Sequence, residues 1–159
     1  MIRHAEAAPL GEGGVTDDAN RPLTPKGEQQ ARSVAAGLQQ RGVMLDRIIC
    51  SPLLRARQTA EGLVQAWSKP APELRVCEEL APGGKRKRVA RFLKRLACDK
   101  VAVVGHQPDL DLFAAWLIGS RRARLNLAKA GVAYIRCDGD PGKGDGELIW
   151  MAPPEFLGS

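Results

Sequence analysis

The chain has 159 residues, of which 44% are hydrophobic and 26% charged, and its formal net charge is +6. This length and composition predict a single globular domain over residues 1–159, and no apolar run approaches the ~20 residues that a membrane-spanning helix needs. Aromatic residues make up only 4% of the chain and form no aromatic–basic motif, so we expect no nucleic-acid partner. The positive charge favours an anionic substrate.

The N-terminus and the cysteines indicate the cellular compartment of the protein. No basic segment followed by an apolar stretch opens the sequence, so no signal peptide is predicted and a cytoplasmic location is expected. The cysteines show no CxxC spacing and have no histidine nearby, which excludes a zinc site by pattern. We expect reduced, mostly buried thiols at Cys50, Cys77, Cys98 and Cys137.

The first quarter of the chain predicts a strand, a loop and a helix. Residues 1–4 form a short apolar lead that ends on an Arg-His pair, as at the end of a strand. Residues 8–23 are rich in glycine, proline and aspartate without periodicity, which predicts a loop. A helix is expected to begin with Thr24 as N-cap and Pro25 at its first position, and to stop at Gly42.

The middle of the chain predicts two strands, each followed by a helix. Residues 47–50 read as a short buried strand, and a helix is expected to open at Ser51-Pro52, with the serine as cap rather than as a nucleophile. A third strand is predicted at 74–77. The segment 85–95 forms a basic helix whose apolar stripe packs inward, so its charges are interpreted as a solvated outer face.

The last third predicts a buried strand, a helix and a hairpin. Residues 101–104 are continuously apolar, as in a central parallel strand, and the helix at 109–118 is apolar nearly all round. Residues 131–137 and 147–151 read as two strands without an intervening helix, hence as an antiparallel hairpin. The fold class is therefore α/β: a three-layer α/β/α sandwich with a mostly parallel sheet and a C-terminal hairpin.

Polar residues follow the predicted strands at the point where each one ends. Arg3-His4 follows the first strand, residues 51–55 the second, Glu78-Glu79 the third and His106 the fourth. Ligands of open α/β sheets bind beyond the carboxyl ends of the strands, so these groups are expected to meet at one edge. Both histidines of the chain are among them.

An edge with arginines and histidines suits a phosphoryl group. The planar guanidinium groups of Arg3 and Arg55 can clamp a tetrahedral anion. A neutral imidazole among them is a competent nucleophile near pH 7. No carboxylate cluster suitable for a metal stands beside these residues, so positive charge has to come from the side chains themselves.

Four segments carry a resemblance to a known family. Arg3-His4-Ala5-Glu6, residues 21–27 (RPLTPKG), residues 51–60 (SPLLRARQTA) and Val104-Gly105-His106 resemble, in order and spacing, the motifs of the histidine phosphatase superfamily, the phosphoglycerate mutase-like enzymes. The short chain and residues 79–84 (ELAPGG) look most like its SixA-type phosphohistidine phosphatases. Members usually carry several apolar residues before Arg-His, where this chain has Met1-Ile2.

The resemblance implies a mechanism and a fold of the phosphoglycerate mutase-like type. His4 would attack phosphorus and become phosphorylated, while Arg3, Arg55 and His106 hold the phosphoryl oxygens. Water would then release phosphate, and neither a metal nor an organic cofactor is implied.

Two further residues receive conditional roles. Relatives that act on alcohol phosphates place a carboxylate after the third strand, where Glu79 (or Glu78) stands, so Glu79 is the candidate general acid. Arg21 is a candidate to reach the phosphate or an acidic substrate from the loop. Arg57 is expected on the helix surface because its position in the motif favours Arg55 as the ligand.

Three functions follow from the resemblance. The first is a phosphohistidine phosphatase whose partner is a histidine phosphotransfer protein of a signalling system. The second is a phosphatase of small phosphate esters, for which Glu79 would have to act. The third is a phosphate-binding signalling domain without turnover. No membrane partner is expected, and the oligomeric state stays open.

Overall fold

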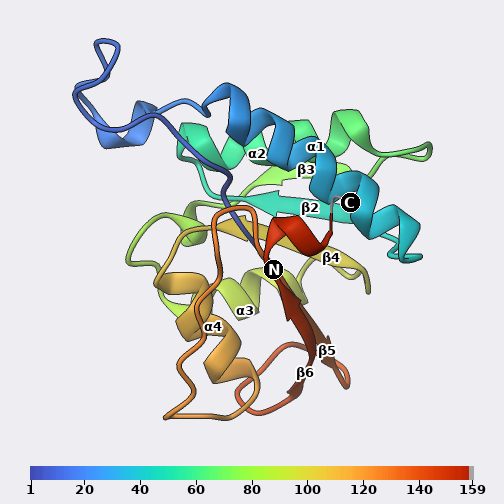
Figure 1. The fold of residues 1–159 in the computed structure, drawn as a ribbon. Coiled ribbons are helices and arrows are strands. Elements are labelled where there is room, and N and C mark those ends of the chain that lie inside the picture. Colours follow the sequence, from blue (N-terminus) through green and yellow to red (C-terminus); the bar gives the residue numbers. More distant parts are fainter. Residues whose placement is uncertain (158–159) are drawn as a thin grey trace.

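The computed structural model describes residues 1–157, which form a six-stranded sheet between helices (Figure 1). The strands are β1 (Ile2–Arg3), β2 (Arg47–Cys50), β3 (Glu73–Val76), β4 (Val101–Gly105), β5 (Val132–Cys137) and β6 (Gly146–Ala152). The α-helices are α1 (Pro25–Gln40), α2 (Leu54–Ala66), α3 (Arg86–Lys94) and α4 (Asp109–Leu117). Short 3-10 helices lie at η1 (Asp18–Asn20), η2 (Glu78–Leu80) and η3 (Pro154–Phe156).

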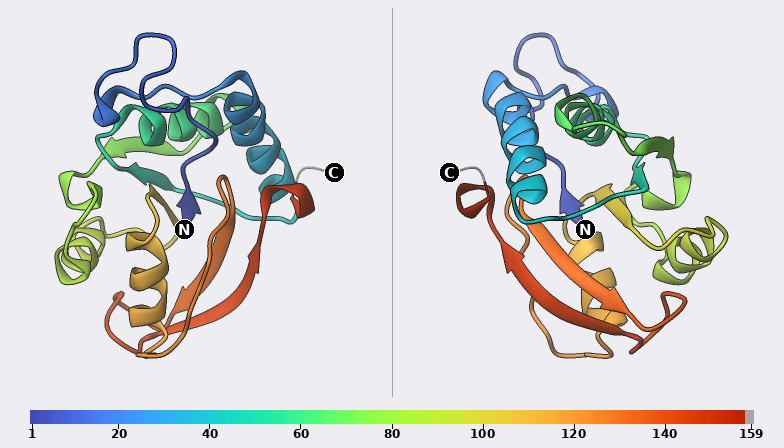
Figure 2. Two further views of the ribbon diagram at one scale, coloured as in Figure 1. Left: turned by 60° about the vertical axis from the view of Figure 1, so that its left-hand side comes forward. Right: turned by 90° about the vertical axis from the view of Figure 1, so that its right-hand side faces the viewer.

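The sheet has the strand order β3-β2-β4-β1-β5-β6. β1 to β4 run parallel, whereas β5 is antiparallel to both β1 and β6. α1 and α2 cover one face, and α3 and α4 cover the other (Figures 1 and 2). The predicted three-layer α/β class, with a mostly parallel sheet and a C-terminal antiparallel hairpin, is confirmed.

The first helix begins as its sequence predicts and approaches the chain after β1 closely. Thr24 caps α1, because its Oγ1 accepts a hydrogen bond of 3.0 Å from the Gly27 backbone N–H. A side chain at Gly27 would clash with the backbone carbonyl of Glu6. The helix can therefore lie against residues 5–7 only because position 27 has no Cβ.

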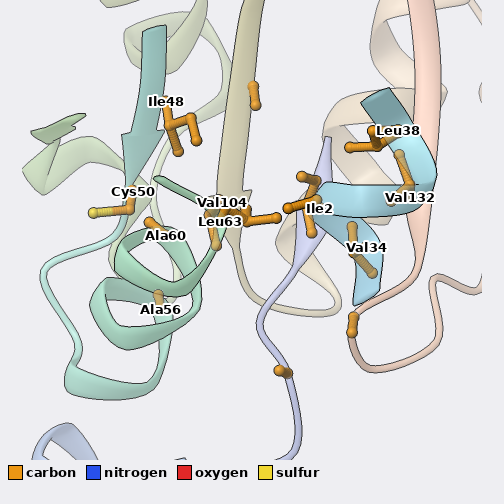
Figure 3. Packing of buried hydrophobic residues seen from close by; sticks show 14 of the residues in the cluster. Ile2, Val34, Leu38, Ile48, Cys50, Ala56, Ala60, Leu63, Val104 and Val132 are labelled. Atoms are coloured by element: carbon orange, nitrogen blue, oxygen red, sulfur yellow. The ribbon is translucent and has the colours of Figure 1, made fainter. Parts of the chain in front are cut away.

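The core consists of two apolar clusters, one on each face of the sheet. Ile2, Ile48 and Val104 of the strands pack with Val34 of α1 and Leu63 of α2 on the first face (Figure 3). On the second face, side chains of the strands pack with those of α3 and α4, and the cluster includes Ile49, Val103, Val89, Leu110 and Phe113. The central strands are thus covered on both faces, as continuous apolar runs require.

The structure corrects the predicted start of the second helix. That helix was expected to open at Ser51-Pro52, but α2 begins at Leu54, with Leu53 before it and no side-chain cap. Ser51 is therefore not the N-cap, and its hydroxyl instead bonds to His106. Within the loop 8–23, Asp17 caps the short helix η1, which periodicity could not reveal in three residues.

The cysteines carry no disulfide. All four are free, with Cys50 and Cys77 buried and Cys98 and Cys137 partly exposed. Burial raises the pKa of Cys50 to about 11, so that this thiol is protonated at neutral pH. Within residues 1–157, none of the helices combines the length and hydropathy that crossing a bilayer demands.

The close approach at Gly27 can be tested by replacing it. Alanine normally stabilises a helix interior by up to about 1 kcal/mol relative to glycine. We expect Gly27→Ala instead to lower the free energy of unfolding by about 1–3 kcal/mol, because the added methyl group must displace the Glu6 backbone. Urea denaturation measures the change. Gln29→Ala on the exposed side of α1 is the control, and an equal or higher midpoint for Gly27→Ala would contradict the packing described here.

Candidate active site

The site is built on the end of β1. The backbone N–H of His4 donates to the Gly105 carbonyl at 2.9 Å, and the His4 carbonyl accepts from Ala130 N–H at 3.2 Å. These bonds connect the residue after β1 to the C-terminal end of β4 and to the segment before β5. The ring centroids of His4 and His106 lie 5.2 Å apart, with a tilt of 54°. The sheet therefore brings together the only two imidazoles of the chain.

The hydrogen bonds of His4 fix its tautomer. Nδ1 lies 2.8 Å from the Ala5 carbonyl oxygen, which can only accept, so Nδ1 carries the hydrogen. Nε2 is then the unprotonated nitrogen, and Arg55 Nε donates to it at 3.3 Å. The lone pair of Nε2 points toward the cationic end of the site. This is the protonation pattern that a nucleophilic imidazole requires.

Arg55 comes from the first turn of α2 and is 5% exposed. Besides contacting His4, its Nη1 donates to the Asp18 carbonyl at 2.7 Å, and its Nη2 donates to Asp18 Oδ2 at 3.1 Å. A buried guanidinium needs such partners, because an unpaired charge in the interior is costly. These bonds thereby orient the Arg55 side chain so that its Nε donates to His4 Nε2.

Arg3 approaches the site from β1 itself. Its Nη1 donates to the Leu127 carbonyl at 2.8 Å, whereas its buried Nε has no partner among the described residues. Burial lowers the pKa of the Arg3 guanidinium, and the Asp111 carboxylate opposes that shift. A guanidinium stays charged at neutral pH, so the Nε of Arg3 is an unused charged donor beside His4.

His106 follows β4 and is 3% exposed. Its Nε2 lies 2.7 Å from Ser51 Oγ, at the end of β2, and its Nδ1 is buried without a partner among residues 1–157. Ser51 thus orients the second imidazole. Its role as a supporting residue could not be read from the sequence, where a serine before a proline equally signals a cap.

Asp18 is the site residue that the sequence did not single out. Its Oδ1 accepts from Arg21 Nη1 at 3.0 Å, while its Oδ2 accepts from Arg55. Arg21 also donates from Nε to the Ala8 carbonyl at 2.6 Å and reaches the site through Asp18, not by touching His4. One of two adjacent aspartates in a polar loop carries no pattern that reveals such a contact.

The electrostatics keep both imidazoles neutral. Burial is the largest cause that lowers the pKa of His4 to about 4; the guanidinium groups of Arg55, Arg3 and Arg21 lower it further, and the bond to Ala5 opposes them. The pKa of His106 falls to about 3, through burial first, then through the proximity of His4 and of the Arg55 and Arg3 guanidiniums, with Asp18 opposing. At neutral pH the site thus combines neutral imidazoles with charged guanidiniums, which suits an anion.

Glu79 lies at the border of the site. It shares with His106 the lining of a cavity of about 20 Å³, but it makes no hydrogen bond to either imidazole. Its carboxylate is 3.9 Å from the Arg88 guanidinium, and both side chains are substantially exposed. Arg57 is exposed on α2, away from the buried Arg55. The structure therefore gathers Arg3, His4, Arg55 and His106 and leaves Glu79 and Arg21 at the rim.

Comparison with known proteins shows similarity to one superfamily of phosphatases. Residues 1–84 match the model of the histidine phosphatase superfamily (branch 1). An uncharacterized protein of Picosynechococcus sp. is 41% identical over 163 aligned residues, which cover 99% of this chain and 96% of that protein. The phosphohistidine phosphatase SixA of Escherichia coli is 29% identical, over 97% of this chain and 92% of its own length.

A solved structure agrees with these matches. The protein histidine phosphatase SixA in complex with tungstate superposes with a TM-score of 0.84 at 28% sequence identity. The match covers 98% of this chain and 96% of that one. Similarity thus extends over both halves of the fold, including the end of β4 that carries His106.

The lowered pKa values can be measured directly, because the chain has only two histidines. We expect no titration of either imidazole between pH 8 and about 5 by NMR, since the values lie near 4 and 3. Unfolded histidine titrates near ~6.5, so the unfolded chain binds more protons, and stability should fall as the pH drops from ~6.5 toward 4. His106→Gln assigns the signals, and a midpoint near ~6.5 for His4 would contradict this electrostatic account.

Proposed function

Because the chain belongs to the histidine phosphatase superfamily and is a phosphatase, we propose that it hydrolyses phosphohistidine on a protein, with His4 as the nucleophile. The observation that carries the proposal is the state of His4: a neutral imidazole whose Nδ1 is bonded to a carbonyl and whose unprotonated Nε2 accepts from Arg55. The choice of phosphohistidine is supported by the similarity to SixA and by the lack of a carboxylate bonded to either imidazole among the described residues.

In the first step, Nε2 of His4 attacks phosphorus. The Nε2–P bond forms as the P–N bond to the substrate imidazole breaks, and the leaving imidazole keeps the proton on its other nitrogen and departs neutral. Ala5 continues to accept from Nδ1–H, which disperses the positive charge that develops on the His4 ring. The structure needs no movement of that proton during the attack.

In the second step, water attacks the phosphorus of phospho-His4. The P–O bond forms, the P–Nε2 bond breaks, and the protons of the water end on inorganic phosphate and solvent. The electron pair returns to Nε2, so that His4 is again neutral. The phosphoryl oxygens carry negative charge throughout, and Arg3, Arg55 and His106 are proposed to hold them.

The leaving group decides how much acid catalysis is needed. A protonated phosphohistidine leaves as neutral imidazole, whereas an alkoxide must be protonated as it departs, for which general acid help is worth typically ~10²–10⁴-fold. Glu79 is paired with Arg88, without a bond to the imidazoles, and a weak acid there suffices for a phosphoramidate. Its place beside His106 in the small cavity is the observation that favours the alternative, a phosphatase of small phosphate esters.

One substitution tests the nucleophile, and a second separates the two substrate classes. We expect His4→Ala to lower turnover of phosphohistidine and of an aryl phosphate by at least ~10³-fold, in the presence of EDTA as in its absence. Glu79→Gln should change kcat for a phosphohistidine peptide by less than about 2-fold while lowering that for alkyl phosphates by ~10-fold or more. Arg57→Ala is the matched control on α2 and should match the unaltered chain. Turnover retained by His4→Ala would refute the assignment of His4 as the nucleophile.

The partner is proposed to be an acidic phosphotransfer protein of a cytoplasmic signalling system. Seven basic side chains lie between Lys85 and Arg95, and two of them, Arg88 and Lys94, form ion pairs in the described structure. Arg86, at the start of α3, lines the same cavity as His106. A basic surface that begins beside the site can steer an acidic protein toward it.

Charge reversal on α3 tests this docking surface. We expect the triple change Lys85→Glu, Lys87→Glu and Arg91→Glu to lower kcat/KM for a phosphorylated phosphotransfer protein by ~10-fold or more at low salt, because association depends on charge. Turnover of an aryl phosphate should stay unchanged. Lys69→Glu with Lys143→Glu, on exposed positions elsewhere, is the control. An equal loss of activity toward both substrates would indicate damage to the site and would contradict a docking role for α3.

A further inference from the structure

Asp111, in the first turn of α4, is a buried carboxylate that takes no part in the proposed reaction. Both of its oxygens accept a hydrogen bond: Oδ1 from the Leu127 backbone N–H at 3.0 Å, and Oδ2 from Gln107 Nε2 at 2.7 Å. Both donors are uncharged, and no cationic side chain within residues 1–157 is bonded to this carboxylate. A carboxylate is costly to bury without a cation, so its place here calls for a role that these two bonds can serve.

The first bond fixes the segment that holds Arg3. The Leu127 carbonyl accepts from Arg3 Nη1 at 2.8 Å and is the one hydrogen-bond acceptor of that guanidinium in the described part of the chain. Residues 120–130 belong to no helix or strand, and they run back from the end of α4 toward the start of β5 (Figure 1). The position of the Leu127 carbonyl therefore depends on side-chain contacts, of which the bond to Asp111 is one.

The second bond connects the same carboxylate to the residue after His106. Gln107 Nε2 donates both to Asp111 Oδ2 and to Asn126 Oδ1, each at 2.7 Å. Asp111 and Gln107 thus join the chain that follows β4 to residues 126–127. One carboxylate of α4 thereby holds together the backbone on which Arg3 leans and the turn that carries the second imidazole.

The geometry of Arg3 gives these bonds a consequence for the site. Its Nε is buried and has no partner among the described residues. A guanidinium is planar and rigid, so an acceptor that fixes Nη1 also restricts the direction of the Nε–H bond. A donor that is held in place before the anion arrives binds it more tightly, because less freedom is lost on binding.

We propose that Asp111 is a positioning residue for Arg3: through the Leu127 backbone it holds the guanidinium so that the free Nε–H meets a phosphoryl oxygen. Asp111 itself does not touch the substrate. The inference rests on the proposed function in one respect only, which is that Arg3 holds the phosphoryl group. It adds a residue outside the predicted site to the machinery that prepares the site.

The charge of Asp111 allows positioning to be separated from simple electrostatics. The carboxylate lies near enough to Arg3 to oppose the fall in the pKa of that guanidinium. A negative charge at this place also repels a phosphate anion. If Asp111 acted through its charge alone, its removal would strengthen phosphate binding. If it acts by holding Leu127, its removal weakens binding although a repulsion is lost, so the two accounts predict opposite signs.

The test compares phosphate binding by three variants of the full chain. We expect Asp111→Ala to raise the Kd for inorganic phosphate by ~10-fold, because the Leu127 N–H loses its acceptor and Arg3 its fixed position. Asp111→Asn keeps an oxygen for Leu127, since Gln107 can turn its amide, and it should bind phosphate at least as tightly as the unaltered chain. Leu112→Ala, on the exposed side of α4, is the matched control and should leave the Kd unchanged.

A second measurement needs no ligand. Hydrogen exchange at Arg3 Nε, whose NMR signal is assigned with Arg3→Lys, should be ~10-fold faster in Asp111→Ala than in the unaltered chain. A phosphate Kd that falls or stays the same in Asp111→Ala, or an unchanged exchange rate, would overturn the proposal. If the unaltered chain bound no phosphate, the proposed function would fail, whereas the exchange rates would still decide the role of Asp111.

Circular dichroism checks that each variant is folded. Should Asp111→Ala be unfolded, Asp111→Glu takes its place, because it keeps the charge and displaces the carboxylate oxygens by a methylene group. Positioning predicts that Asp111→Glu also weakens phosphate binding by ~10-fold. Unchanged binding in that variant would show that the charge of residue 111 is sufficient and would contradict the proposal.

Discussion

The parallel pairing of β1 with β4 is the constraint on which the site depends. Its register places Arg3 opposite Gly105, so the residues that follow, His4 and His106, emerge side by side at the carboxyl edge of the sheet. Residues about a hundred positions apart in the chain meet because two neighbouring strands end together. Arg55 joins them from the helix after β2, the next strand in the sheet. The chemistry is thus a consequence of strand order.

Burial then gives these groups their protonation states. Three guanidinium groups around a pair of buried imidazoles would be unstable if the imidazoles were also charged, and their pKa values are accordingly lowered to about 4 and about 3. Arg55 and Arg21 donate to Asp18 and to backbone carbonyls, whereas the Nε of Arg3 has no partner among the described residues. An anion that binds here compensates charge that the fold leaves exposed to it, so it stabilises the folded chain as it binds.

Much of this could be predicted from the sequence, because the signals were local or periodic. The cap and proline at Thr24-Pro25, the apolar run at 101–104 and the terminal hairpin identified elements whose bounds agree within a few residues. Arg3, His4, Arg55 and His106 could be singled out because each lies at, or shortly after, the end of a predicted strand. Ser51 and Asp18 were not, because their roles depend on contacts between distant segments: Ser51 bonds across to the end of β4, and Asp18 reaches α2 from an irregular loop. No spacing rule encodes such contacts.

Asp18 connects the loop 8–23 to the site, because its carboxylate is bonded to an arginine of each. Its carboxylate accepts from both Arg55 and Arg21, and hydrogen bonds from these groups hold the pKa of Asp18 below its usual range. The same carboxylate opposes the loss of positive charge on His106. Phosphoryl oxygens carry the same sign of charge and accept from the same donors, so a phosphoryl group held by Arg55, as proposed, would compete with Asp18 for that guanidinium. Because Asp18 also holds Arg21, the position of residues 18–21 depends on how Arg55 divides its hydrogen bonds between the loop and the substrate.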